Sequence, residues 1–87
     1  MILHFDFTTL FSFDDFYHAL KGQITLPDYF GNNLDALYDF LCVEAPLPLT
    51  IVFSHLTASQ KDLFNPLINT LREIEKREPL FTFVINC

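Results

Sequence analysis

Three short apolar runs, separated by stretches with helical periodicity, constrain the fold of this chain more than any other feature. The runs are 2–7, 49–53 and 80–85, and each is rich in residues that favour strands. Between them, apolar residues recur at the spacing of a helix. Strands that alternate with helices pair in parallel through right-handed crossovers. The pattern therefore predicts a small α/β domain, a three-stranded parallel β-sheet packed with helices in two or three layers.

Turn-forming and capping residues divide the first helical region. Ser12, followed by an acid three residues later, resembles the start of a helix, and Gly22 is expected to end that helix. Pro27 marks a short structured loop over residues 26–32. Gly31 in that loop is expected to supply a positive φ angle. A loop of this kind can project side chains outward.

A second helix is predicted directly after this loop. Asn33 is expected to cap it, and the helix is expected to end near Cys42. Leu34, Leu37 and Leu41 recur at helical spacing, so they place one apolar face of the helix against the core. The opposite face then points to solvent.

The second half of the chain predicts a central strand and an interrupted helix. The run 49–53 is almost continuously apolar, which is typical of a strand buried on both faces. Residues 57–77 have helical periodicity, but Pro66 predicts a break into two helices. Four residues form the expected apolar stripe of this region: Leu63, Leu67, Leu71 and Ile74.

Length and composition indicate a single domain over residues 1–87. Of the 87 residues, 51% are hydrophobic and 11 are Phe, which is enough apolar surface for a core without disulfides or a structural metal. No apolar run approaches the roughly 18 residues that cross a bilayer. The first residues lack the basic start and cleavage pattern of a secretory signal. We expect a cytoplasmic protein that is a monomer when free and does not bind membranes.

The cysteines and histidines do not support a metal or cofactor site. Cys42 and Cys87 form no CxxC pair and are expected to be buried free thiols. His4, His18 and His55 share no metal-ligand spacing, and single histidines are usually structural or face solvent. GxSxG and Walker glycine motifs are absent from the sequence. We therefore expect no metal, no cofactor and no catalytic residues, and a protein that is not an enzyme.

Charges are unevenly distributed along the chain. There are 11 acids against five bases, and the formal net charge is −6. Between Lys21 and Lys61 the sequence has no Lys or Arg. The acids in that interval are Asp28, Asp35, Asp39 and Glu44. A patch of one sign repels nucleic acid and anionic lipid and favours a cationic partner.

Asp35 and Asp39 lie four residues apart, so they share the face of the second helix opposite its leucines. Like charges at this spacing destabilise an isolated helix by about 0.2–0.5 kcal/mol. Solvated helix faces are commonly charged, and a purely solvated pair stays open as an alternative. Tyr29 and Tyr38 beside the acids favour a binding surface. We expect Tyr29 to point outward and Phe30 to cover the core.

Residues 26–39 read Leu-Pro-Asp-Tyr-Phe-Gly-Asn-Asn-Leu-Asp-Ala-Leu-Tyr-Asp. This segment closely resembles the binding loop and helix of barstar-like ribonuclease inhibitors. The likeness extends more weakly over the whole chain, because its length and its predicted order of strands and helices agree with the barstar fold. The resemblance implies an inhibitor that binds a basic, secreted-type microbial ribonuclease one-to-one, blocks its phosphate site and protects the producing cell.

The resemblance implies roles for both helix acids and for the loop tyrosine. Asp39 would occupy the place of a substrate phosphate among basic catalytic side chains of the nuclease. Asp35 would contact the rim of that basic site. Tyr29 would stack over a catalytic histidine of the nuclease. Asp39 is therefore the first candidate for the dominant contact.

Further contacts implied by the resemblance surround these three residues. Gly31, Asn33 and Leu34 would pack against loops of the nuclease. Tyr38 would fill an aromatic contact position at which family members often carry tryptophan. Glu73 matches a further interfacial acid on the late helix. The tyrosine at position 38 departs from the family pattern and bears on which nuclease is bound.

Two other classes of function remain as alternatives. A non-inhibitory interaction module of the same fold would bind another cationic protein. A hydrolase could use Asp35 and Asp39 as acid and base, but side chains one helical turn apart on an exposed face enclose no cleft. Arg72, Lys76 and Arg77 lie near a predicted helix carboxyl end, where they are more simply a solvated group than a nucleic-acid patch.

Overall fold

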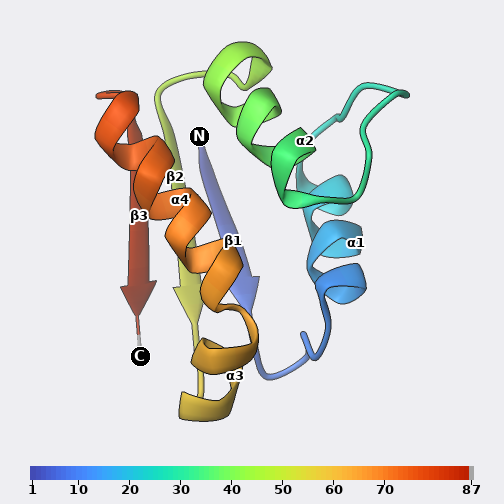
Figure 1. Cartoon of the computed structure of the whole chain (residues 1–87), viewed down its shortest axis with the longest axis vertical. Coiled ribbons are helices and arrows are strands. Elements are labelled where there is room, and N and C mark those ends of the chain that lie inside the picture. The colour runs from blue at the N-terminus through green and yellow to red at the C-terminus, as the bar shows by residue number, and fades with distance from the viewer. Residues whose placement is uncertain (87) are drawn as a thin grey trace.

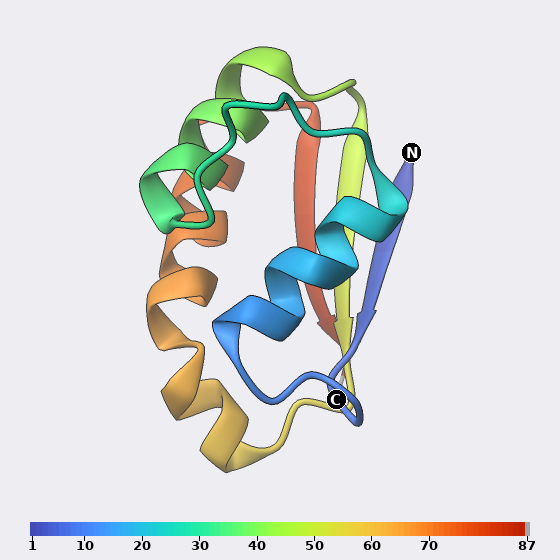
Figure 2. The ribbon, with the colours of Figure 1, turned by 90° about the vertical axis from the view of Figure 1, so that its right-hand side faces the viewer.

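The computed structural model describes residues 1–86 as two layers, a sheet and a set of helices on one of its faces (Figure 2). The strands are β1 (Ile2–Asp6), β2 (Leu49–Ser54) and β3 (Phe81–Asn86). They pair in parallel in the order β1-β2-β3, so β2 is central (Figure 1). The predicted three-stranded parallel sheet is confirmed, with two layers rather than three.

Helical segments make both connections between the parallel strands. The first connection contains α1 (Phe13–Gln23), α2 (Leu34–Asp39) and the π-helical turn η1 (Phe40–Glu44). The second contains α3 (Ala58–Leu63) and α4 (Asn65–Arg77). Both connections cross the same face of the sheet (Figure 2).

Side-chain caps fix where α1 and α2 begin. The hydroxyl of Ser12 accepts a hydrogen bond from the N–H of Asp15 at 3.1 Å. The Oδ1 atom of Asn33 accepts one from the N–H of Ala36 at 2.8 Å. Such a cap satisfies a backbone donor that has no partner within its helix and contributes about 1 kcal/mol. Both predicted helix starts are confirmed, and Asn33 sets which residues of α2 face the core.

The two glycines differ from expectation. Gly22 is the last residue but one of α1, which ends at Gln23, so the helix runs one residue past the predicted stop. Gly31 does not have a positive φ angle. A Cβ atom on Gly31 would instead lie 2.9 Å from the Nδ2 atom of Asn33. Glycine is therefore favoured there by its close approach to the amide that caps α2.

Strand β2 is not buried on both faces as expected. Its inward residues Leu49, Ile51 and Phe53 are fully buried, whereas Thr50 and Val52 on the other face are half-buried. The reason is the two-layer arrangement, in which the helices cover one face and leave the second to solvent (Figure 2). The flanking strands give the outer face of β2 its partial cover.

The long helical region is interrupted, as predicted, and the break falls at Phe64. Pro66 lies in the first turn of α4. Backbone N–H groups in that turn have no partner within the helix, so a proline there costs no helical hydrogen bond. Leu63 precedes the break and is exposed, so its predicted place in the apolar stripe is wrong. The rest of the stripe, Leu67, Leu71 and Ile74, is fully buried against the sheet side of the molecule. The stripe therefore begins only after the chain changes direction.

Phenylalanine rings fill the space between the two layers. The ring of Phe53 on β2 lies 4.7 Å from that of Phe7 and 4.8 Å from that of Phe83, measured between centroids. Phe5 and Phe16 complete the cluster around Phe53. Full burial of such a side chain contributes about 1.5–3 kcal/mol. This cluster is the rigid base on which the helices rest.

Two further sequence expectations concern cysteine and membranes. Cys42 is half-buried rather than fully buried, because it lies on η1 at the margin of the helical layer. Cys87 lies outside the described residues. Within residues 1–86, no helix has the length and apolar character needed to cross a membrane.

Candidate functional site

The chain after Asn33 presents its acids to solvent because the opposite face is held in the core. Leu37 and Leu41 are fully buried, whereas Asp35 and Asp39 are exposed. Leu34 is half-buried and packs against the core. The two carboxylates therefore lie one turn apart on the outer face of α2, as the spacing predicts.

The second helix does not end near Cys42 but continues through η1 to Glu44. The N–H of Ala45 donates to the carbonyl oxygen of Phe40 at 2.8 Å, across the five-residue span of a π-helical turn. Val43 and Glu44 both lie at the exposed surface, and 81% of Val43 is accessible. The two added residues bring a third acid to the surface that carries Asp39.

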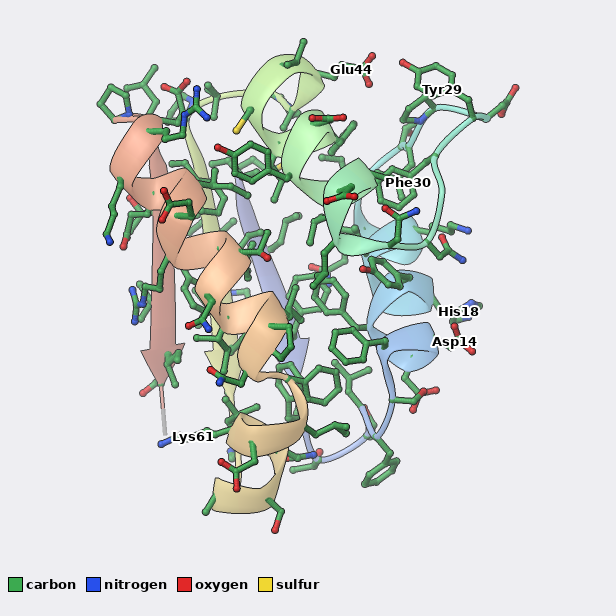
Figure 3. The ribbon with its side chains drawn as sticks, in the orientation of Figure 1. Asp14, His18, Tyr29, Phe30, Glu44 and Lys61 are labelled. Carbon is green, nitrogen blue, oxygen red and sulfur yellow. The ribbon has the colours of Figure 1, made fainter. Side chains whose placement is uncertain are left out.

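Two neighbouring aromatic residues of the loop point in different directions. The ring of Phe30 packs between those of Tyr17 and Phe40, at 6.2 Å and 6.1 Å between centroids. The N–H of Phe30 also donates to the carbonyl oxygen of Pro27 at 2.9 Å, which closes a turn. Tyr29 is 77% exposed and points away from the core (Figure 3). Both predicted orientations are confirmed, and Phe30 anchors the loop that carries Tyr29.

The exposed tyrosine of the loop is tied to η1 by its hydroxyl. The Tyr29 O–H donates a hydrogen bond to the Oε1 atom of Glu44, and the two side chains lie close together (Figure 3). This hydrogen bond is the main reason that the pKa of Tyr29 is raised above its usual value, with the negative charge of Glu44 adding to it. The pair joins two segments that are 15 residues apart.

A hollow of roughly 600 Å³ lies between the loop, α2 and η1. We refer to it as the first hollow. Its lining comprises Pro27, Tyr29, Phe30, Gly31, Asn33, Ala36, Asp39, Phe40, Val43 and Glu44. An aromatic ring, an apolar floor and two carboxylates therefore meet at one place, which suits a cationic group that also has an apolar or planar part.

A second hollow of roughly 410 Å³ lies on the other side of Asp39. Its lining comprises Tyr38, Asp39, Cys42, Val43, Arg77 and Glu78. The Nη1 atom of Arg77 donates to the Tyr38 hydroxyl at 2.7 Å, and this bond is the main cause of the raised pKa of Arg77. Asp39 borders both hollows. Its carboxylate thus lies on the ridge between a tyrosine held by Glu44 and a tyrosine held by Arg77.

Comparison with known proteins decides the family. The family model described as "Barstar (barnase inhibitor)" matches residues 1–86. The chain belongs to the barstar family. A protein of Bacillus subtilis (strain 168) whose name is "Putative ribonuclease inhibitor YrdF" is 37% identical over 59 residues. The match covers 68% of this chain and 65% of that relative, so the chain spans less than two thirds of the length of the relative.

The barstar family assignment confirms the resemblance seen in residues 26–39 and the fold expected from it. The parallel sheet with its helices is the architecture that this family implies. The described residues of this barstar-family chain place five of the predicted binding residues at the two hollows. Those five are Tyr29, Gly31, Asn33, Tyr38 and Asp39.

Three predicted binding residues line neither hollow. Asp35 is exposed on α2, one turn before the ridge. Leu34 is partly packed into the core, so only part of its side chain is available to a partner. Glu73 is exposed on α4 and acts on the nearby Arg77 by its charge. These residues surround the hollows rather than form them.

Glu44 and Arg77 are among the residues at the hollows that were not predicted as binding residues. Glu44 had a signal in the sequence, because it belongs to the acidic interval, but its bond to Tyr29 depends on the π-helical turn. Arg77 had none, because it lies 39 residues from Tyr38. Its arrival beside Asp39 corrects the expectation of a surface of one sign, and its bond to Tyr38 corrects the expectation that it is only solvated.

Among residues 1–86, no three or more His, Cys, Asp or Glu side chains gather as a group that could hold a metal ion. The Nδ1 atom of His55 lies 3.1 Å from the Oδ1 atom of Asp6, where Asp6 is the last residue of β1 and His55 directly follows β2. The Asp6 pKa is lowered mainly by hydrogen bonds from Thr8, with a smaller contribution from His55.

Proposed function

We propose that this barstar-family chain inhibits a basic, barnase-like microbial ribonuclease by filling its phosphate-binding site, one inhibitor per nuclease. The observation that carries the proposal is the exposed carboxylate of Asp39 on the ridge between two hollows. A carboxylate held outward on a capped helix can occupy the place of a phosphate among cationic side chains. The activity is binding, and no catalytic step by this chain is part of it.

The surrounding residues support this use of Asp39. Tyr29 offers an exposed ring for stacking on a planar cationic side chain of the nuclease. Asp35 adds a carboxylate one turn away, and Glu73 adds another on α4. Gly31 and Asn33 at the first hollow and Leu34 at its margin would contact loops of the nuclease. Tyr38 would make the aromatic contact on the other side of Asp39.

Electrostatics favours such a partner at long range. The chain has a net charge of −6, whereas a ribonuclease must present positive charge to bind phosphate. Opposite potentials accelerate encounter and align the partners. We propose that residues 1–87 act as one unit, monomeric when free, in the cytoplasm of a cell that must be protected from its own ribonuclease.

A second candidate function is a non-inhibitory module that binds another cationic protein. The observation that favours it is Arg77, which places a positive charge beside Asp39 at the second hollow. Arg77 repels positive charge at the second hollow, so it favours a partner whose positive charge is limited to the part that faces the first hollow, and such a partner need not be a ribonuclease. The two candidates differ in a simple respect, because only the first requires loss of ribonuclease activity on binding.

The test is inhibition of purified barnase-like ribonucleases titrated with this protein. We expect stoichiometric inhibition, and we expect Asp39→Ala to weaken it by about one to two orders of magnitude, since a charged hydrogen bond contributes about 1.5–3 kcal/mol. Asp62→Ala on α3 is the matched control, because Asp62 is exposed and lies outside both hollows. Circular dichroism checks that each variant is folded.

The possible outcomes separate the candidates. Full-strength inhibition by Asp39→Ala would show that the site is wrongly assigned. Binding without loss of ribonuclease activity would favour the interaction module. Inactivity against every ribonuclease tested, with the fold intact, would contradict the inhibitor proposal.

A further inference from the structure

The side chain of Tyr29 has little to hold it except its hydroxyl. The residue is 77% exposed and belongs to a loop whose backbone hydrogen bonds run from Phe30 to Pro27 and from Asn33 to Gly31. Its neighbour Phe30 is fixed by packing, but Tyr29 points the other way (Figure 3). An exposed aromatic side chain without a partner samples several rotamers in solution.

The partner that restrains Tyr29 is the carboxylate of Glu44. This acid comes from η1, on the far side of the first hollow from the loop. Both residues line that hollow together with Asp39. The hydrogen bond therefore fixes the tyrosine ring relative to the carboxylate on the ridge, in the free protein and before any partner arrives.

We propose that Glu44 is a positioning residue of the binding surface, which holds the ring of Tyr29 beside Asp39 in the orientation that a partner meets. This inference rests on the proposed function and extends it to a residue that contributes through Tyr29. Ordering a side chain on binding costs about 0.5–1.5 kcal/mol, and a ring that is ordered beforehand avoids that cost. Loss of the hydrogen bond between Tyr29 and Glu44 should therefore weaken the affinity for the partner roughly two- to twelvefold.

The hydroxyl group makes the inference specific. If Glu44 acts through Tyr29, then Tyr29→Phe, which keeps the ring, should weaken binding by about the same factor as Glu44→Ala. The double variant should be little weaker than either single variant, because both break the same bond. Tyr38→Phe is the matched control, since its hydroxyl binds Arg77 instead, and its effect should add to that of Glu44→Ala.

Two conservative replacements separate position from charge. Glu44→Gln keeps an oxygen that can accept from Tyr29 and removes the negative charge. Glu44→Asp keeps the charge on a shorter side chain that no longer reaches the hydroxyl. Positioning predicts that Glu44→Gln retains most of the affinity and Glu44→Asp loses most of the two- to twelvefold, whereas a purely electrostatic role predicts the reverse order.

The effect of Glu44 on Tyr29 can be measured in the free protein, without a nuclease. Tyrosine labelled with ¹³C at Cζ gives one NMR signal for each of the three tyrosines, and Tyr29→Phe assigns the relevant one. The hydrogen bond and charge of Glu44 raise the pKa of Tyr29, so Glu44→Ala should lower that pKa toward its usual value. The same variant should also average the χ1 rotamers of Tyr29, as read from side-chain couplings.

Each result supports or overturns the inference. A Tyr29 pKa and rotamer distribution that do not change in Glu44→Ala would overturn it, whatever the partner. A fixed ring combined with fully additive effects of Tyr29→Phe and Glu44→Ala on ribonuclease affinity would also overturn it. The hydrogen bond between Tyr29 and Glu44 could be present in the free protein while the unaltered chain binds no ribonuclease. That result would overturn the proposed function and with it the role of Glu44 in binding.

Discussion

At the residue scale, the buried hydroxyl of Tyr17 is an unfavourable feature of the fold. Tyr17 on α1 is 2% exposed, and its hydroxyl has no hydrogen-bond partner among residues 1–86. Its ring, in contrast, packs well, because it contacts Phe16 and Phe30. The ring therefore supports the loop anchor, while the hydroxyl group costs free energy of folding.

Replacement of Tyr17 by phenylalanine should stabilise the protein. Removal of an unsatisfied buried hydroxyl recovers part of a desolvation cost of about 1–3 kcal/mol, and the ring contacts remain. We expect the free energy of unfolding in urea to rise by about 1 kcal/mol. Tyr38→Phe is a useful comparison, since that hydroxyl accepts a bond from Arg77 and its loss should be neutral or destabilising. A less stable Tyr17→Phe protein would mean that the hydroxyl has a favourable partner.

Alkaline pH should destabilise the fold through the same hydroxyl. Burial raises the pKa of Tyr17 to about 12, whereas an unfolded chain would ionise it near its ordinary value of 10.0. Between these values the unfolded state releases the proton first, so stability is complete below about pH 10 and falls as the pH rises toward 12. Unfolding measured across this range should show a decline that is smaller in Tyr17→Phe. An equal decline in both proteins would assign the effect to other groups.

At the scale of elements, helix side chains bond to the backbone of one residue on each edge strand of the sheet. On β1, Gln23 donates from Nε2 to the carbonyl oxygen of His4 at 2.7 Å and accepts from its N–H at 2.9 Å. On β3, the Oε2 atom of Glu75 accepts from the N–H of Phe83 at 2.9 Å, and Arg72 donates to the carbonyl oxygen of Phe83 at 2.9 Å. At these two residues, α1 and α4 thus supply the bonds that a further strand would make. Closed edges protect a sheet against pairing with another chain.

Opening the β1 edge should reduce stability and promote association. Gln23→Ala removes both bonds to His4, which together contribute about 1–3 kcal/mol. Gln23→Glu can still accept from the N–H of His4 and should give an intermediate loss. Urea unfolding measures the first effect, and light scattering at rising concentration measures the second. An alanine variant as stable and as monodisperse as the unaltered chain would show that the edge is protected by other means.

The same elements show what the sequence could reveal. Helix starts at Ser12 and Asn33 were predictable because Ser and Asn are preferred capping residues, and each side chain accepts a hydrogen bond from the backbone N–H three residues later. The loop and helix of residues 26–39 were recognisable as one contiguous segment. The π-helical turn was not predictable, because its extra residue has no local signature. The contact between Tyr38 and Arg77 was not predictable either, since it depends on how α2 and α4 cross.

At the scale of the whole molecule, rigidity and charge act on the same surface. Phe16 and Tyr17 of α1 pack against each other, and the ring of Phe30 packs against Tyr17. These contacts hold the loop against α1. Asn33 fixes α2, so the ridge at Asp39 is held by capped and packed elements on both sides. The net charge of −6 then acts over distances at which no contact exists. Position and long-range attraction are thus supplied by different parts of the sequence.

This division predicts how salt affects association with a ribonuclease. The screening length falls from about 14 Å at 0.05 M to about 4 Å at 0.5 M salt, so steering by the net charge is lost while contacts at Asp39 are screened much less. We expect the association rate constant in stopped-flow measurements to fall about tenfold or more over this range, with a much smaller change in the dissociation rate. If salt acted mainly on dissociation instead, the charges would matter at the contact surface and steering would not be their role. Glu44→Gln should leave most of this dependence in place, because it removes one negative charge of the 11 acids and keeps the acceptor for Tyr29.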